Sequence, residues 1–237
     1  MYTYALIQTP ETDLDLPLGI KSSLQLVGNQ QISAIVEPGL NPEELQQDDA
    51  FLLQAVLAHD RVIQSLFLQT PLLPLRFGTF LPPEALRDHL TTRTTSYLQQ
   101  LRQLAGKAEY ILKFQPVEQP VTPPPIQAKG KEYFLAKKQQ FQAQLEWQQQ
   151  QQQQRQQLLL LAQAAFSRRL VVNLQVAEAS QESQPGVEKV YLLIEQEREQ
   201  LLQEEIQNWI QQCQYWAISL EGPLPPYHFI STLSVPG

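Results

Sequence analysis

Cysteine is nearly absent from this chain, since Cys213 is the single one in 237 residues. A disulfide within the chain is therefore excluded, and the usage suits a reducing cytoplasm. No apolar run approaches the length of about 18 residues that a transmembrane helix needs. The stretch 1–7 has no basic start and no small-residue cleavage site, so we expect a first strand there and not a signal peptide.

The residues of common catalytic and metal sites are also scarce. Only nine glycines occur, and none has the spacing of a phosphate-binding loop. The three histidines lie far apart, no cysteine pair is present, and no serine stands in a G-x-S-x-G motif. We therefore predict no catalytic residue, no cofactor and no metal, which means that the chain is not an enzyme.

Basic charge is not concentrated anywhere. The formal net charge is −7, and the densest basic groups, Lys129–Lys138 and Arg168-Arg169, are too sparse for a nucleic-acid footprint. We therefore expect no nucleic-acid partner. With no spanning segment predicted, we expect no membrane partner either.

The most structured stretch is Leu73-Pro74-Leu75-Arg76-Phe77-Gly78-Thr79. Its apolar residues alternate, which predicts a strand with one buried face that begins at a sheet edge or a bulge because of the proline. Arg76 is a lone charge there. We predict that Arg76 is buried against a carboxylate or carbonyl group; the alternative is an Arg76 that faces a partner.

Residues 1–115 predict an α+β domain. Strands are expected at 2–7, 24–27 and 31–37, the last two joined by a Gly28-Asn29 turn. A helix should follow from about Asn41 to Leu68, with Leu45, Leu52, Val56, His59, Ile63 and Leu66 on its buried face. His59 is interpreted as a hydrogen-bonded core histidine.

A second helix in this domain should begin at Pro82-Pro83-Glu84 and end before Gly106. Its buried stripe is predicted to be Leu86, Leu90, Tyr97, Leu101 and Leu104. A strand at 108–114 ends the domain.

A proline-rich segment, 116–128, is the predicted linker to a C-terminal domain at 129–221. That domain should begin with a long helix over 129–166, in which the run Gln148–Gln154 is an exposed helical segment. Strands at 170–176 and 187–194, a helix that ends near Cys213 in the core, and a strand at 215–220 then give most of a ferredoxin-like fold. Its first strand is 108–114 or an element near 117–122.

The chain ends in a proline-rich tail, 222–237, which should lack regular structure and lie against a domain. The two middle strands of the C-terminal domain are apolar at nearly every position, so both faces of their sheet need cover. The other domain, the tail around Tyr227, or a partner can supply it. If a partner supplies it, Val171, Leu193 and Tyr227 are the predicted partner-binding residues, and Arg76 joins them under its partner-facing alternative.

Three patches together resemble the gas vesicle protein F/L family (GvpF/GvpL), more the F type than the L type. They are the 73–79 stretch, Lys129-Gly130-Lys131-Glu132-Tyr133-Phe134-Leu135, and Gly222-Pro223-Leu224-Pro225-Pro226-Tyr227-His228-Phe229. The resemblance covers almost the whole chain. Leu224 departs from the pattern, because the family commonly has tryptophan there.

The resemblance implies a two-domain α+β fold and a minor structural or accessory component of gas vesicles, the gas-filled buoyancy organelles inside prokaryotic cells. The implied partners are the major wall protein (GvpA-type) and other gas vesicle accessory proteins, bound during vesicle nucleation or assembly or on the finished wall. Two alternatives stay open, a nucleotide-dependent enzyme of unknown type and a generic helical scaffold.

Overall fold

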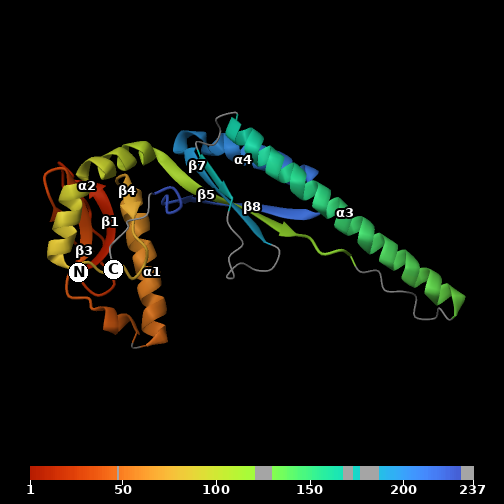
Figure 1. The fold of residues 1–237 in the computed structure, drawn as a ribbon, viewed down its shortest axis with the longest axis horizontal. Helices are drawn as coiled ribbons and strands as arrows, with labels where there is room; N and C mark the ends of the chain where they lie inside the picture. Colours follow the sequence, from red (N-terminus) through yellow and green to blue (C-terminus); the bar gives the residue numbers. More distant parts are fainter. Residues whose placement is uncertain (47, 121–129, 168–172, 177–186, 231–237) are drawn as a thin grey trace. The chain divides into compact units, whose positions relative to one another are not determined.

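The computed structural model of this protein describes residues 1–46, 48–120, 130–167, 173–176 and 187–230. Two four-stranded sheets and four α-helices lie within these ranges, which confirms the α+β class (Figure 1). The chain forms two compact units. Unit 1 comprises Met1–Glu109 and the chain from Pro223 onward, and unit 2 comprises Tyr110–Gly222.

The extents of the units differ from the expected domain boundaries. The strand predicted at 108–114 is β5 (Lys107–Pro116), and it is hydrogen-bonded into the sheet of unit 2. The first of the two alternatives for the missing strand of that sheet is therefore confirmed. Most of the linker that we predicted after this strand lies outside the described residues.

The sheet of unit 1 has the strand order β2-β3-β1-β4. Its strands are β1 (Tyr2–Gln8), β2 (Gln25–Gly28), β3 (Ile32–Glu37) and β4 (Leu72–Pro74). The β1–β3, β1–β4 and β2–β3 pairings are antiparallel, with Leu6 opposite both Ala34 and Leu73. The predicted hairpin between β2 and β3 is confirmed, and the Asn29 side chain accepts hydrogen bonds from two backbone N–H groups in its turn.

The central strand β1 is buried over Tyr2–Ile7, so both of its faces need cover. Helix α1 (Asp49–Phe67) contacts β1 and β4, and helix α2 (Pro83–Leu104) contacts β1, β3 and β4. Figure 1 shows the strands of this unit between the two helices. The core on the α1 side combines tyrosines of β1 with Ala55, Val62, Ile63 and Leu66.

Helix α1 begins later than the sequence predicted. A separate 3-10 turn, Pro42–Gln46, precedes it, and the Asp48 carboxylate accepts a hydrogen bond from the backbone N–H of Ala50 as the N-cap. An aspartate cap satisfies a backbone donor that a helix start otherwise leaves free. Leu52, in the first turn of this later-starting helix, was predicted to be buried but is 37% exposed.

Helix α2 agrees with its prediction in both bounds and packing. It begins at Pro83, where a proline needs no helical N–H, and Gly106 follows it with a φ of 68°. Its five buried residues are the five predicted, Leu86, Leu90, Tyr97, Leu101 and Leu104.

Unit 2 follows the element order β5-α3-β6-β7-α4-β8 with the sheet order β6-β7-β5-β8. The bounds are α3 (Lys131–Ser167), β6 (Asn173–Val176), β7 (Glu188–Glu195), α4 (Glu199–Gln212) and β8 (Trp216–Leu224). Strands β6 and β7 pair in antiparallel fashion. The N-terminal half of α3 extends beyond the sheet of this unit (Figure 1).

The glutamine run is helical, as predicted, but it is not wholly exposed. Gln151 and Gln154 are half-buried, and their side chains bind the segment that leads into β8. The Gln154 amide oxygen accepts from the Tyr215 backbone N–H at 2.9 Å, while its nitrogen donates to the Gln212 carbonyl at 3.3 Å. Two amides of the run therefore satisfy backbone groups at the end of α4 and just after it.

Cys213 does not lie on the buried face of a helix, which corrects its prediction. Helix α4 ends at Gln212, and Cys213 is its half-buried C-cap residue. The thiol donates a hydrogen bond to the Gln154 amide oxygen, and burial raises the pKa of the Cys213 thiol. The thiol therefore stays protonated at neutral pH.

The final strand is longer than predicted, because β8 continues through Gly222 and Pro223 to Leu224. β8 lies at the end of the sheet order, and an edge strand tolerates a proline because one side of its backbone has no partner strand. The part of the tail expected to lack regular structure therefore begins after Leu224.

We predict that Gln154→Ala destabilises the protein by about 1–3 kcal/mol, because it leaves the Tyr215 N–H without its acceptor. Gln153→Ala is the matched control, since Gln153 is an exposed neighbour in the same run, and its cost should stay within about 0.5 kcal/mol. Urea unfolding followed by circular dichroism measures both. Equal costs for the two variants would mean that the contacts of Gln154 contribute nothing.

Candidate interaction surface

The 73–79 stretch forms a short strand followed by a tight turn. Only Leu72–Pro74 belongs to β4, and Leu72 through Leu75 are all buried, so the predicted alternation of burial is wrong. The strand is covered on both faces because β4 lies under helices α1 and α2. Gly78 then adopts a φ of 80°, and the Thr3 N–H donates to the Thr79 carbonyl, which returns the turn to β1.

Arg76 is exposed at the start of this turn, which corrects the prediction of a buried arginine. Its backbone carbonyl accepts a hydrogen bond from the Thr79 hydroxyl at 2.6 Å. Within the described ranges, no carboxylate forms an ion pair with its guanidinium. Strand β4 ends at Pro74, before the predicted alternation reaches Arg76, so this residue lies in the turn and its side chain is exposed.

His59 is buried at the centre of unit 1 and lies between β1 and the turn. Its Nδ1 accepts from the Tyr2 hydroxyl at 2.8 Å, and its Nε2 donates to the Leu75 carbonyl at 3.2 Å. Burial lowers the pKa of His59 to about 4, although the Leu75 carbonyl favours the protonated form. The ring is therefore neutral at pH 7, which confirms the interpretation of a hydrogen-bonded core histidine.

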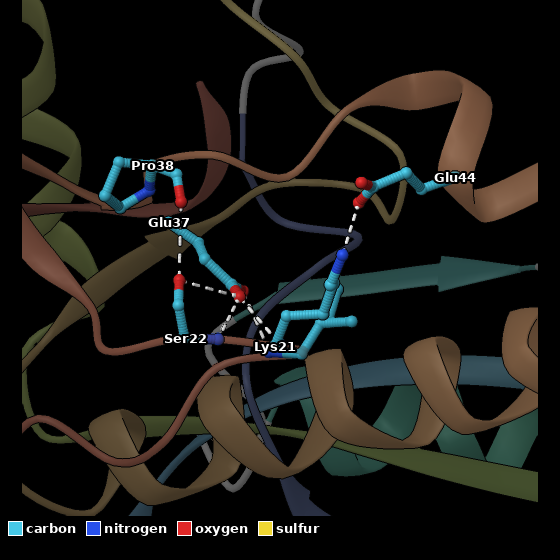
Figure 2. A network of polar contacts seen from close by, with 6 residues as sticks. Lys21, Ser22, Glu37, Pro38 and Glu44 are labelled. Atoms are coloured by element: carbon cyan, nitrogen blue, oxygen red, sulfur yellow. Dashed lines mark hydrogen bonds and ion pairs between the residues drawn. The ribbon is translucent and has the colours of Figure 1, made fainter.

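Glu37 is fully buried at the end of β3, and no pattern in the sequence indicated this (Figure 2). Its carboxylate accepts from the Tyr4 hydroxyl and from the backbone N–H groups of Ile20, Lys21 and Ser22. Burial alone would raise the pKa of Glu37, but these hydrogen bonds outweigh it and lower the pKa below its ordinary value.

The approach of this loop to the carboxylate depends on a glycine. A Cβ atom at Gly19 would stand only 2.4 Å from the Glu37 Oε2 atom. Glu37 therefore fixes the loop that precedes β2, and the whole arrangement is a structural clamp inside unit 1.

The tail returns to unit 1, as expected from its aromatic residues. Tyr227 is half-buried against the core of that unit, and the backbone N–H of His228 donates to the buried Glu109 carboxylate at 2.8 Å. The His228 Nδ1 atom lies 2.6 Å from the other Glu109 oxygen. Tyr227 thus contributes to the core of its own chain, and a partner-binding role for its remaining exposed surface stays a prediction.

The other two predicted partner residues are not on the described surface. Val171 lies outside the described residues. Leu193 is in β7 but only 5% exposed, because the chain itself covers both faces of this strand, and this removes it from a partner's reach. At Leu193, the apolar strand is therefore buried by residues of its own chain.

Among the described residues, the two aromatic side chains with the highest exposed fractions, Phe134 and Phe141, lie instead on the N-terminal half of α3. Phe134, Phe141 and Leu145 are 75%, 61% and 42% exposed, and their spacing of seven and four residues places them along one face of the helix. We call these three residues the α3 stripe. Lys137 and Lys138 are exposed on either side of it. The sequence predicted a helix here, but only the fold shows that these apolar residues are uncovered.

A smaller apolar group lies on α1 of unit 1. Leu53 and Leu57, one turn apart, are 62% and 61% exposed. Across the ranges that the structure describes, no helix is long and apolar enough to span a bilayer, and no group of three or more acidic, histidine or cysteine residues is arranged to hold a metal ion.

We predict that Glu37→Gln lowers the free energy of unfolding by about 2–4 kcal/mol. In the wild type, backbone N–H groups donate to both carboxylate oxygens. In either orientation of the new amide, its NH2 group therefore faces one of these donors. Glu44→Gln is the control, because Glu44 forms only a surface ion pair with Lys21 and its loss should cost less than about 1 kcal/mol (Figure 2). Chemical denaturation at pH 7 measures both, and a Glu37→Gln cost no larger than that of Glu44→Gln would contradict the clamp.

His59 should make the stability of the protein depend on pH. Because the native ring resists protonation down to about pH 4 while the unfolded chain binds a proton near pH 6.5, acid favours the unfolded state between these values. The contribution of neutral His59 to the free energy of unfolding is complete above pH 6.5, and about 3 kcal/mol of it is lost by pH 4. Urea unfolding of the wild type and of His59→Gln, at several pH values, should give curves that converge towards pH 4. Parallel curves would exclude this role.

Comparisons with known proteins agree with this fold. The chain matches the family model described as "Gas vesicle synthesis protein GvpL/GvpF" over residues 1–231. A comparison with curated protein sequences gave no match.

Two solved structures share the fold. They are the gas vesicle protein GvpF from Anabaena sp. PCC7120, at 15% identity and a TM-score of 0.66, and GvpF from Microcystis aeruginosa, at 16% and 0.63. The first alignment covers 98% of this chain and 96% of the other, and the second covers 96% and 97%. Since the family model matches nearly the full length, the chain belongs to the gas vesicle synthesis protein GvpL/GvpF family.

Proposed function

We propose that this protein is a minor structural or accessory component of gas vesicles that binds the major wall protein (GvpA-type) during vesicle nucleation or assembly. Its membership in the gas vesicle family supports this role. A wall that encloses gas requires an apolar inner surface, and wall subunits expose that surface before they assemble. A protein that covers it would prevent aggregation and could remain on the finished wall.

The α3 stripe is the observation that favours binding to such a surface. An exposed aromatic face costs solubility unless a partner covers it, and the described residues of the chain leave this one open. Lys137 and Lys138 on either side favour a partner whose apolar patch is bordered by carboxylates. This replaces the sheet surface around Leu193 as the proposed docking site, and the exposed Arg76 is a second, polar contact that we retain.

We further propose that unit 2 is a ferredoxin-like domain and that the two units are separate domains. The element order β5-α3-β6-β7-α4-β8 with the sheet order β6-β7-β5-β8 supports the first statement. We also propose a location on gas vesicles inside the cell and an F-type rather than an L-type member, supported by the three sequence patches. A non-catalytic role agrees with the family, and no observation on the described residues favours the nucleotide-dependent enzyme or the generic scaffold.

The test is co-purification of the wall protein with a tagged form of this chain from cells that produce both. Phe141→Glu should reduce the recovered wall protein about tenfold or more, because it places a charge in the centre of the apolar contact. The same chain should remain folded, since Phe141 is exposed. Leu160→Glu is the matched control, because Leu160 is 64% exposed on another face of the same helix.

Unaltered recovery with Phe141→Glu would reject the α3 stripe as the docking site. A failure of the wild type to recover wall protein would reject the proposed binding altogether. Probing washed, floated vesicles for the chain then separates a component that stays on the wall from one that acts only in assembly.

A further inference from the structure

Strand β8 is an edge of the unit 2 sheet. In the sheet order it neighbours β5 alone, so among the described strands its other side has no partner. The Val117 N–H, just after β5, donates to the Tyr215 carbonyl just before β8, and Lys113 of β5 forms an ion pair with Glu221 of β8. The two strands therefore run antiparallel.

The backbone groups that face the open side of β8 follow from this pairing. The Tyr215 carbonyl points towards β5, and backbone groups of successive strand residues point to alternate sides. The N–H and C=O groups of Ile218 and Leu220 therefore point away from β5. They are available to a further strand.

The open part of β8 lacks the features that usually block an edge. Glu221 and Pro223 protect its C-terminal end, but Trp216-Ala217-Ile218-Ser219-Leu220 contains no charge and no proline. Natural proteins place charges, prolines or bulges on edges that must stay unpaired. This segment is therefore suited to pairing.

A groove of about 860 Å³ runs between this strand and helix α4. Its apolar residues are Ile206, Ile210, Ile218 and Leu220, and the amide groups of Gln200, Gln203, Gln207 and Asn208 lie along the α4 side. Glu204 is its one charged residue, and the Gln200 amide donates a hydrogen bond to it. An added strand would fill this groove with the side chains that it directs to the helix side of the sheet.

We propose that the occupant is a second copy of this chain, whose β8 pairs with this β8 around a two-fold axis and joins the two sheets of unit 2. The edge is self-complementary in the antiparallel register centred on Ile218. Trp216 then lies opposite Leu220 of the second copy, and Ala217 lies opposite its Ser219. Apolar residues meet apolar residues on the helix side, and small residues meet on the exposed side.

The charges of β8 itself are compatible with this occupant and this register, and Glu204 in the groove accepts a hydrogen bond from Gln200 of its own helix. The two Glu221 side chains lie at opposite ends of the paired strands, roughly 20 Å apart, and their repulsion is screened at that distance. The amide-rich faces of the two α4 helices approach each other near the axis, where side-chain amides can both donate and accept. A C2 contact of this kind closes after two copies and leaves no open edge at β8.

Sedimentation equilibrium of the full chain tests the proposal. A monomer–dimer equilibrium should appear, and Leu220→Lys should raise its dissociation constant about tenfold or more by placing a charge against Trp216 of the second copy. Leu160→Lys is the control, because Leu160 is exposed on α3 and does not line the groove. A chain that is monomeric at all concentrations, or a dimer that Leu220→Lys leaves unchanged, would overturn the proposal.

A cross-linking experiment checks the register without a charge in the groove. Ala217→Cys and Ser219→Cys are made separately in a Cys213→Ser background, whose hydroxyl can still donate to Gln154. Positions opposite each other in a non-hydrogen-bonded antiparallel pair lie within disulfide range. Under mild oxidation the mixed proteins should form a 217–219 disulfide between copies, while each protein alone should not. Absence of the mixed product would refute the register and the pairing.

Discussion

The buried strand β1 is the constraint on which unit 1 depends. Its first residues include two tyrosines, and a hydroxyl that is removed from water needs a partner. The Tyr2 hydroxyl donates a hydrogen bond to His59 on α1, and the Tyr4 hydroxyl donates one to Glu37 on β3. These two hydrogen bonds connect the sheet to the helix and to the loop before β2. The position of each neighbouring element thus follows from satisfying polar groups as well as from apolar packing.

Unit 2 is organised by helix α3, which is far longer than its sheet requires. Its C-terminal half buries Leu158 and Ala162 and uses amides of the glutamine run to hold the start of β8. Its N-terminal half extends beyond the sheet of this unit (Figure 1). Phe134 and Phe141 remain exposed there, whereas Trp147 packs against Tyr215. The two segments of this helix therefore differ in role: the C-terminal half packs within unit 2, and the N-terminal half carries the proposed docking surface.

The two proposed contacts use different physics and different parts of unit 2. The α3 stripe offers apolar area between lysines, which suits an apolar partner surface. The β8 edge offers backbone hydrogen bonds with a defined register, which suits a strand of matching sequence. Because the residues do not overlap, one contact can be removed by substitution while the other is kept.

Local sequence patterns determined the element order, the bounds of α2 and its five buried residues, the helical state of the glutamine run and the resemblance to the gas vesicle family. Periodicity and capping are properties of residues close together in the sequence, so they can be recognised without knowledge of the tertiary structure. Tertiary structure decided the rest. Glu37 became buried because a loop distant in sequence brings three N–H groups to it, and Arg76 became exposed because the turn left the strand early. Gln154 could be separated from its six identical neighbours, and Leu193 from the surface, only by contacts with residues far along the chain, which no local pattern encodes.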